Sequence, residues 1–252
     1  MASNFENWGQ FLIFKMSAKA NDAFTFRLRN SFPITVERTM LGPFRDCFFD
    51  EKYLRHLPDA IQSMREPTIV DIGANVGYFS LYALYKYPKA RIFSFEPLPF
   101  CFNQLQKYQN EYKNPSFTVY NYAVGKIDGP INFYVNSADS FSTDSSIQPT
   151  AGKTILKVQS HKLETLKEML NIGRINLLKL DCEGAEYDIL YALTPKDFQN
   201  IDYITMEVHN VDKERDNVFK MVDFLKENQY QVFHEDIVKN PLGGHVWAAL
   251  KK

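Results

Sequence analysis

The sequence predicts an α/β protein built on a mostly parallel, Rossmann-like sheet of seven strands, with an antiparallel hairpin at the C-terminal edge. Three observations predict this fold. From residue 68 onward, short apolar segments alternate with helical ones. A glycine-rich turn follows the first of these apolar segments, and two further strand-like segments come near residue 250. A chain of 252 residues, 45% of them hydrophobic, can bury the core of one sizeable domain.

Residues 1–64 are predicted to form a helical and β-hairpin extension ahead of this domain. Apolar and polar residues alternate over 24–29, and the same period resumes at 34–36 after a turn-forming Asn-Ser-Phe-Pro, which is typical of a β-hairpin. Weak helical patterns flank the hairpin over about 5–20 and 51–64. We expect this extension to cover one edge or mouth of the sheet.

Residues 65–252 carry the alternation that βαβ units require. Apolar faces at helical spacing predict one helix around Cys101–Tyr112 and another around Val218–Leu225. The terminal hairpin is expected to pair 230–234 with 245–250. The other five strands are expected at about 68–72, 91–96, 116–121, 175–181 and 201–208.

An insertion at about 129–160 interrupts this alternation. Ile131, Phe133 and Val135 have the period of a strand, whereas the segment from Ser137 to Gly152 is polar and rich in turn residues. Such a segment is typical of a loop near an active site. Its polar side chains either close over a substrate or form a solvated turn; they are Ser140, Ser142, Thr143 and Asp144.

Composition disfavours several classes of partner. With 29 Lys and Arg against 30 Asp and Glu, the chain has no global cationic field, so we expect no nucleic-acid substrate. Cys47, Cys101 and Cys182 show no metal-ligand spacing and are expected to be reduced thiols. The apolar run at 11–14 is too short for a signal or membrane helix. We therefore expect a cytoplasmic protein without membrane insertion.

The strand expected at 68–72 runs into the pattern D-x-G-x-N-x-G and then into a helix. A dinucleotide-binding loop has glycine at three positions, but Asn75 and Tyr78 occupy the second and third of them here. An acidic Asp71 beside the turn suits a ligand that carries an amino group or a cation rather than a pyrophosphate. S-adenosylmethionine has an α-ammonium and a sulfonium and no phosphate, so this loop favours it.

A second acidic residue supports the same ligand. The next strand ends in Phe95-Glu96-Pro97, which places the Glu96 carboxylate where the two ribose hydroxyls of an adenosyl group are expected. The alternative is a glycine turn that serves only helix–strand packing, with Glu96 in solvent.

Polar residues also end the fourth and fifth strands, namely Asp181, Glu183, Glu207 and His209. Ligands of open parallel sheets bind at the carboxyl ends of the strands, and alternation puts the members of each pair on one side. Methyl transfer to a hydroxyl needs an oriented nucleophile and a proton acceptor. A neutral His209 is the expected general base, with Asp181 or Glu183 as alternatives. For Glu186 we expect a structural role at the start of a helix over about 184–193.

Other functions remain open at this stage. Two carboxylates and a histidine can also hold a divalent cation that binds a diol, although the spacing shows no clear chelating trio and no metal ligand is assigned. A nicotinamide-dependent oxidoreductase is disfavoured by Asn75 and Tyr78. A non-catalytic Rossmann-fold binding protein would keep the same fold.

Over residues 45–250 the sequence resembles the FkbM methyltransferase family. The resemblance rests on four segments, 71–77 (DIGANVG), 95–97 (FEP), 121–125 (NYAVG) and 178–186 (LKLDCEGAE). It implies a class I methyltransferase fold and transfer of a methyl group from S-adenosylmethionine to oxygen, on a sugar, a glycan or a small secondary metabolite. One departure is Cys182, where the family more often has an aliphatic residue.

The resemblance further implies which residues bind the cofactor. Gly73, Asn75 and Gly77 line its methionine and ribose end, Glu96 holds the ribose, and Ala123 lies beside the adenine. Acceptors vary widely within the family, and this chain offers no template for naming one. With the residues inferred above, the predicted cofactor set is Asp71, Gly73, Ala74, Asn75, Gly77, Tyr78, Phe79, Glu96, Pro97, Ala123 and Asp181.

Overall fold

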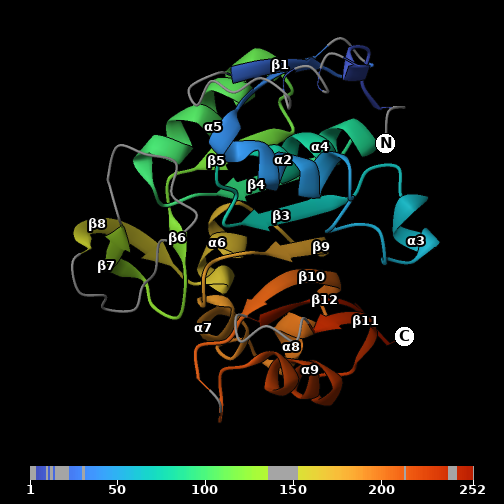
Figure 1. Ribbon diagram of the computed structural model, residues 1–252. Coiled ribbons are helices and arrows are strands. Elements are labelled where there is room, and N and C mark those ends of the chain that lie inside the picture. Colours follow the sequence, from blue (N-terminus) through green and yellow to red (C-terminus); the bar gives the residue numbers. More distant parts are fainter. Residues whose placement is uncertain are drawn as a thin grey trace.

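The protein has two smaller sheets beside a central seven-stranded one in its computed structural model, which describes residues 4–9, 11, 14, 23–29, 32–135, 153–212, 214–237 and 243–251. The central sheet has the order β11-β12-β10-β9-β3-β4-β5 (Figure 1). Its strands are β3 (Thr68–Ile72), β4 (Arg91–Phe95), β5 (Phe117–Tyr120), β9 (Ile175–Leu180), β10 (Ile201–His209), β11 (Tyr230–Ile237) and β12 (Gly243–Leu250).

The strand directions confirm the predicted fold class. All pairs among β10, β9, β3, β4 and β5 are parallel, whereas β12 runs antiparallel to both of its neighbours, β10 and β11. The five core strands and the terminal hairpin thus lie within one or two residues of the ranges expected from the sequence, apart from a longer β11.

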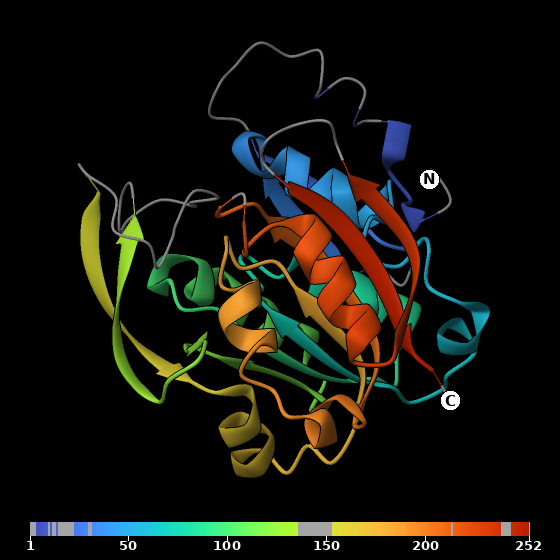
Figure 2. The same ribbon diagram turned by 90° about the horizontal axis from the view of Figure 1, so that it is seen from below.

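Helices cover both faces of this sheet, which explains why its strands are apolar on both sides. Neighbouring residues of β3 show the division, since Ile69 joins one buried cluster and Val70 joins the other. One face carries α4 (Tyr78–Lys86) and α5 (Pro99–Tyr112). Figures 1 and 2 show the other face covered by α6 (Leu163–Met169), α7 (Glu186–Leu190), α8 (Pro195–Phe198) and α9 (Val218–Glu227).

The N-terminal extension packs on the α4 side. The predicted hairpin is confirmed as β1 (Ala23–Arg27) paired with β2 (Pro33–Glu37). It leads through the short η2 (Arg38–Met40) into α2 (Leu41–Phe48), which contacts α4 through ring pairs such as Phe44–Tyr78 at 5.3 Å. The extension therefore packs on this face of the sheet, and its expected position at an edge stays a prediction.

The helices predicted in this extension differ from those in the structure. Within 51–64 the α-helix α3 covers only Asp59–Gln62, and α2 forms where none was expected. Gly42 and Pro43 conceal α2, because both residues break a helix interior but are tolerated in a first turn. Most of the helix expected at about 5–20 lies outside the described residues, and the proposed boundary at residue 64 stays a prediction.

The insertion contains more strand than expected. Its first part is β7 (Gly129–Val135), as predicted, but β8 (Thr154–His161) pairs antiparallel with it and in parallel with β6 (Ala123–Val124). The strand at 154–161 was not predicted from the sequence. Residues 136–152, with Ser140, Ser142, Thr143 and Asp144, lie outside the described residues.

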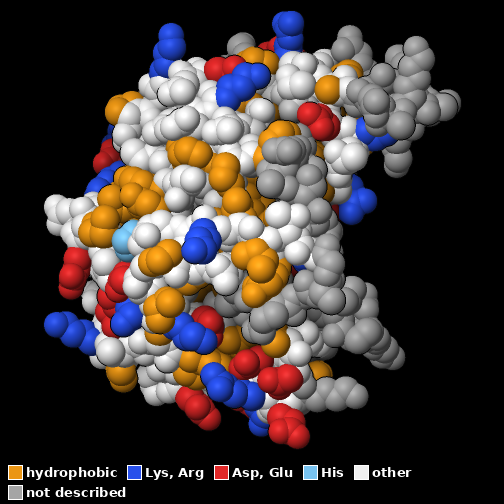
Figure 3. All heavy atoms as spheres, turned by 90° about the vertical axis from the view of Figure 1, so that its left-hand side faces the viewer, with side chains coloured by type: hydrophobic (Ala, Val, Ile, Leu, Met, Phe, Trp, Pro, Cys, Tyr) orange, Lys and Arg blue, Asp and Glu red, His pale blue; other side chains and the backbone are white. Residues whose placement is uncertain are grey.

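The surface on the β7–β8 side mixes acidic, basic and hydrophobic side chains (Figure 3). Among the residues that the structure describes, no helix has the length and apolar character needed to cross a membrane.

Candidate active site

A cavity of about 700 Å³ opens at the carboxyl ends of β3, β4, β9 and β10. This is the edge where an open parallel sheet binds its ligands. Most residues of the predicted cofactor and catalytic sets line it. From the cofactor set these are Gly73, Ala74, Asn75, Tyr78, Phe79, Glu96, Pro97, Ala123 and Asp181, and the catalytic set adds Glu183, Glu207 and His209 to Asp181. Asp71 and Gly77 are not among the lining residues.

The turn after β3 depends on two glycines. Gly73 has φ +73°, and a Cβ at this position would lie 1.8 Å from the backbone oxygen of Asp181. Gly77 has φ +91°, and its Cβ would lie 2.5 Å from Leu105 Cδ1 on α5. Between them Asn75 is also left-handed, at φ +51°, and its side-chain oxygen is buried without a hydrogen-bond partner among the described residues. The turn thus brings backbone and an amide oxygen to the cavity wall.

Glu96, just after β4, is held by the same turn. Its carboxylate accepts hydrogen bonds from the backbone N–H groups of Asn75 at 2.7 Å and Leu98 at 2.9 Å. Only 5% of the residue is exposed, and burial raises its pKa to about 7 against the opposing effect of these two bonds. The carboxylate therefore lies in a fixed orientation at the cavity wall, and its role in binding ribose stays a prediction.

Asp71 does not reach the cavity, so the expected contact with a ligand ammonium is not supported. Its carboxylate is fully buried beneath the turn, where Ser80 donates a hydrogen bond at 2.6 Å and the Lys179 ammonium lies at 3.0 Å. Lys179 also donates to the backbone oxygen of Gly73 at 2.8 Å. Asp71 and Lys179 together fasten the glycine turn to β9.

Lys179 was not singled out from the sequence. The signal was a lysine within the apolar segment INLLKL, since a lysine there needs a buried partner. Burial acts to lower its pKa, but the carboxylates of Asp71 and Asp181 outweigh that effect and raise it. Lys179 is therefore a buried cation at neutral pH.

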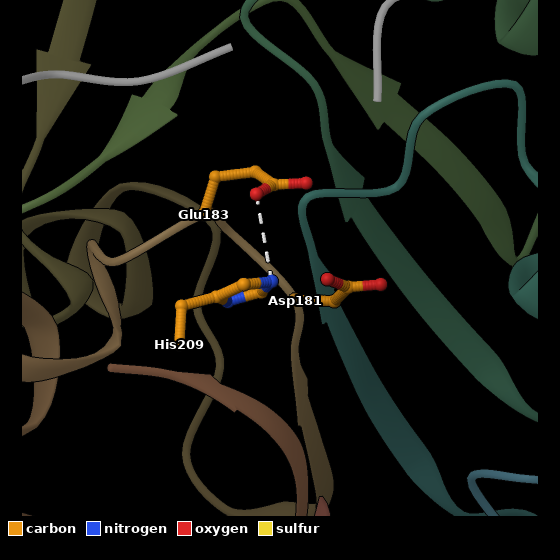
Figure 4. Close-up of side chains that lie close together, drawn as sticks. All are labelled: Asp181, Glu183 and His209. Carbon is orange, nitrogen blue, oxygen red and sulfur yellow. Dashed lines mark ion pairs between the residues drawn. The ribbon is translucent and has the colours of Figure 1, made fainter. Parts of the chain in front are cut away.

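The acidic rim of the cavity comes from the ends of β9 and β10. Asp181, Glu183 and His209 each offer one ligand atom, and these atoms lie within 4.8 Å of one another (Figure 4). His209 Nε2 is 3.5 Å from a carboxylate oxygen of Glu183. Glu183 has a left-handed backbone, φ +53°, which is uncommon for a residue other than glycine. The structure thus brings three of the four predicted catalytic residues together.

Glu186 orients His209 from behind. It is fully buried, and its two oxygens accept hydrogen bonds from the backbone N–H of Cys182 at 2.8 Å and of Gly184 at 2.9 Å. One of these oxygens is also 3.1 Å from His209 Nδ1. The structural role expected for Glu186 at the start of α7 is present, and its contact with the imidazole was missed.

These contacts change the expected chemistry of His209. Burial acts to lower its pKa, but the bond to Glu186 and the charges of Glu183 and Asp181 raise it to about 10. The imidazole is therefore protonated at neutral pH in this arrangement. The expectation of a neutral imidazole that accepts a proton is not met here.

The N-terminal extension supplies two further residues that the sequence analysis missed. From the turn between α2 and α3, Tyr53 donates a hydrogen bond to Asp181 at 2.6 Å, and Lys52 forms a 2.5 Å ion pair with Glu207. Burial acts to raise the pKa of Asp181, but Lys179, His209 and Tyr53 hold it below its usual value. No local motif marks this turn, because the fold alone brings it to the rim.

Comparison with known proteins identifies the family. The model of the FkbM methyltransferase domain matches residues 71–232, which include the glycine turn, Glu96 and the whole acidic rim. The chain belongs to the FkbM methyltransferase family. It is therefore an S-adenosylmethionine-dependent methyltransferase, as the sequence predicted.

Relatives include methyltransferases of differing acceptors. The chain is 28% identical over 183 residues to methyltransferase 1 of Beauveria bassiana, covering 65% of this chain and 71% of that protein. It is 25% identical to the 31-O-demethyl-FK506 methyltransferase FkbM of Streptomyces tacrolimicus, covering 75% and 82%. It is 26% identical to the hexuronic acid methyltransferase AglP of Haloferax volcanii, covering 66% and 64%.

Solved structures similar to this FkbM-family chain include cofactor-bound methyltransferases. The magnesium protoporphyrin IX methyltransferase of Synechocystis, with bound S-adenosylmethionine, has a TM-score of 0.46 and 9% identity, covering 84% of this chain and 83% of that one. TrmK of M. capricolum, with bound S-adenosylhomocysteine, has a TM-score of 0.46 and 12% identity, covering 79% of this chain and 70% of that one. At these TM-scores the fold assignment rests on the sheet topology and the family match.

Proposed function

We propose that this FkbM-family enzyme transfers the methyl group of S-adenosylmethionine to a hydroxyl of a sugar, a glycan or another small molecule. One observation carries the proposal: a single cavity joins the glycine turn and Glu96 at one end to the acidic rim at the other. Donor and acceptor can therefore meet within one enclosed space.

The cofactor is proposed to lie along the wall formed by the turn. The Glu96 carboxylate accepts from the ribose hydroxyls, Asn75 and the backbone after Gly73 contact the methionine end, and Ala123 lies beside the adenine. This path directs the sulfonium toward Asp181 at the rim. Negative charge at that position favours the cationic sulfur of the bound donor.

The acceptor hydroxyl is proposed to lie against Asp181, Glu183, Glu207 and His209. Its oxygen forms a bond to the methyl carbon while the S–CH₃ bond breaks, and that electron pair stays on sulfur as S-adenosylhomocysteine forms. The hydroxyl proton passes to Glu207. We favour this carboxylate because its side chain is 35% exposed and lies outside the His209 cluster, so that it can release the proton to solvent.

Two kinds of support favour an oxygen acceptor of modest size. The relatives include enzymes named for 31-O-demethyl-FK506 and for a hexuronic acid. In addition, an acidic rim disfavours acceptors rich in phosphate.

Calorimetric titration with S-adenosylhomocysteine tests where the cofactor binds. We expect saturable binding by the wild-type protein and an affinity at least tenfold lower for Glu96→Gln, which loses one acceptor for the ribose hydroxyls. Glu111→Gln is the matched control, because Glu111 forms an exposed pair with Lys107 on α5. Equal affinities for the two variants would contradict the cofactor placement.

A radiolabelled methyl-transfer assay tests the acceptor class. Uronic acids, neutral sugars, small polyhydroxylated metabolites, amines and thiols are offered with labelled S-adenosylmethionine. We expect base-stable labelling of a hydroxyl compound. Labelling confined to amine or thiol compounds would contradict O-methylation.

A further inference from the structure

We propose that Asp181, Glu183 and His209 bind one divalent cation, Mn²⁺ or Mg²⁺, beside the acceptor. The inference deepens the proposed function, because it states how the acceptor hydroxyl is held and activated at that same rim.

The three side chains converge from two neighbouring strands. Asp181 and Glu183 follow β9 and His209 ends β10, and Figure 4 shows the imidazole and both carboxylates turned toward one shared space. Their ligand atoms lie within 4.8 Å of one another. Donors that each sit about 2.1 Å from one ion lie up to about 4.2 Å apart. Small side-chain rotations are therefore enough to place all three on one cation.

The contact between Glu186 and His209 is an independent indication of a metal site. Histidine ligands characteristically donate their second ring N–H to a carboxylate, which fixes the ring and directs the other nitrogen at the metal. Here Nδ1 is 3.1 Å from the buried Glu186, and Nε2 is directed at Glu183. Two backbone N–H groups hold Glu186 in place. The ring orientation is therefore set before any ligand arrives.

The backbone of Glu183 points to the same role. A left-handed conformation at a non-glycine residue costs free energy and persists where the surrounding structure enforces it. At φ +53° the Glu183 carboxylate lies 3.5 Å from His209 Nε2. A site that gathers ligands is a physical reason for keeping this conformation.

The carboxylates around His209 outnumber the positive charges that pair with them, which favours binding of a cation. Asp181, Glu183 and Glu186 surround one imidazole. The two nearby lysines form their ion pairs with other carboxylates, Lys179 with Asp71 and Lys52 with Glu207, although the charge of Lys179 also acts on Asp181. A divalent ion would displace the proton from His209 Nε2 and take its place as the positive charge that faces these carboxylates. Two hard oxygen ligands and one imidazole suit Mn²⁺, and Mg²⁺ uses the same octahedral geometry.

Such an ion would act on the acceptor through its open positions. Three protein ligands leave the rest of an octahedral shell for water and for acceptor oxygens, so an acceptor with two adjacent oxygens, such as a vicinal diol or a hydroxy acid, is favoured. A metal-bound hydroxyl loses its proton more readily, and Glu207 lies outside the ligand set to receive it.

Electron paramagnetic resonance titration with Mn²⁺ tests the site directly. We expect one saturable Mn²⁺ per chain in the wild-type protein and at least tenfold weaker binding by Glu183→Gln. The matched control is Asp188→Asn. Asp188 lines the same cavity but pairs with Lys126 at 3.0 Å, so its loss removes a negative charge without removing a ligand, and we expect less than a twofold effect.

Two results would overturn the inference: no saturable Mn²⁺ binding by the wild-type protein, or equal weakening by the two variants. Calorimetry with S-adenosylhomocysteine on the same samples distinguishes failure of the metal site from failure of the proposed function. If the protein binds S-adenosylhomocysteine but no Mn²⁺, only the proposed metal site is wrong. If Glu183→Gln does not fold, as judged by circular dichroism, His209→Gln is the replacement variant.

Discussion

At the residue scale, the end of β4 holds a carboxylate under two opposing influences. Burial favours the neutral form of Glu96, while the N–H groups of Asn75 and Leu98 favour the charged form. The net effect raises its pKa from 4.5 to about 7. The folded protein therefore binds a proton here more tightly than the unfolded chain does, and the associated stability is lost as the pH rises through this interval.

This shift predicts a pH-dependent difference between the wild-type protein and Glu96→Gln. The free energy of unfolding of the wild type, relative to the variant, should fall by about 3 kcal/mol between pH 4.5 and pH 8. Urea unfolding of the ligand-free proteins across this range measures it. Glu111→Gln, with its exposed carboxylate, should follow the wild type, and a relative stability that increases with pH would contradict the assigned shift.

The Tyr53 hydroxyl gives a second residue-scale prediction. Tyr53→Phe removes the hydrogen bond to Asp181 but keeps the ring contact with Phe79 at 5.3 Å. Because a hydrogen bond to a charged group contributes about 1.5–3 kcal/mol, we expect kcat to fall about tenfold or more. Calorimetry should show an S-adenosylhomocysteine affinity within about threefold of the wild type. A variant with unchanged kcat would show that Tyr53 only fills space.

At the scale of elements, the turn between β3 and α4 is held by close packing and by one buried ion pair. Gly73 lies against the end of β9, and Lys179 reaches from β9 to both Asp71 and the Gly73 backbone. The turn and the rim therefore move as one unit, so damage to one should reach the other.

Gly73→Ala should separate the two strand ends. Its Cβ would meet the Asp181 oxygen at 1.8 Å in a conformation that also strains alanine. We expect the free energy of unfolding to drop by about 2–4 kcal/mol and nucleoside binding to be lost. Gly173→Ala is the control, since no atom lies within 4 Å of its added Cβ. Denaturant unfolding and calorimetry of both variants measure the difference.

Lys179→Met should leave Asp71 as an unpaired buried charge. Removing one partner of a buried pair costs about 3–5 kcal/mol. The double variant Asp71→Asn with Lys179→Met should recover part of that loss, because it removes the stranded charge as well. A double variant less stable than the single one by urea unfolding would show that the pair does not act as described.

Local patterns foretold the elements that repeat a simple period and missed those that do not. The strands at 68–72 and 175–180 are mostly apolar, so their positions could be predicted from the sequence. Strand β8 was missed because its inward residues are Leu156, Val158 and the polar Ser160, which weakens the alternation. The rim residues could be predicted because ligands of open parallel sheets bind at the carboxyl ends of the strands. Their protonation states could not be predicted, because these depend on burial and on neighbours that are distant in sequence.

At the scale of the whole molecule, the two faces of the sheet pack against different sets of elements. One buried cluster contains residues of the N-terminal extension, α4 and α5. The other contains residues of α6, α7, α8 and α9. The cavity opens at the sheet edge between them, with Lys52 and Tyr53 on one side and His209 on the other. Because the extension supplies Lys52 and Tyr53, sequence motifs and the strand ends of the sheet account for only part of the rim.

Because the cavity is formed only in the folded chain, cofactor binding should stabilise the whole protein. At a concentration of S-adenosylhomocysteine about 100-fold above its dissociation constant, the gain is about 2.7 kcal/mol, which should appear as a rise in melting temperature. NAD at the same concentration should give no rise. A rise in melting temperature with NAD but not with S-adenosylhomocysteine would contradict the proposal that the glycine turn binds S-adenosylmethionine.

Trp247 in β12 donates its indole N–H to the backbone oxygen of Lys52 at 3.1 Å, across 195 positions of sequence. During synthesis on the ribosome, residues 52 and 53 emerge long before this partner exists. The glycine turn and its strand can pack early, whereas the wall that bears Lys52 and Tyr53 must wait for translation to pass residue 247. A nascent chain stalled before β12 therefore lacks both the strand between β10 and β11 and the donor that holds this wall, so the complete cavity can form only after residue 247 has been made.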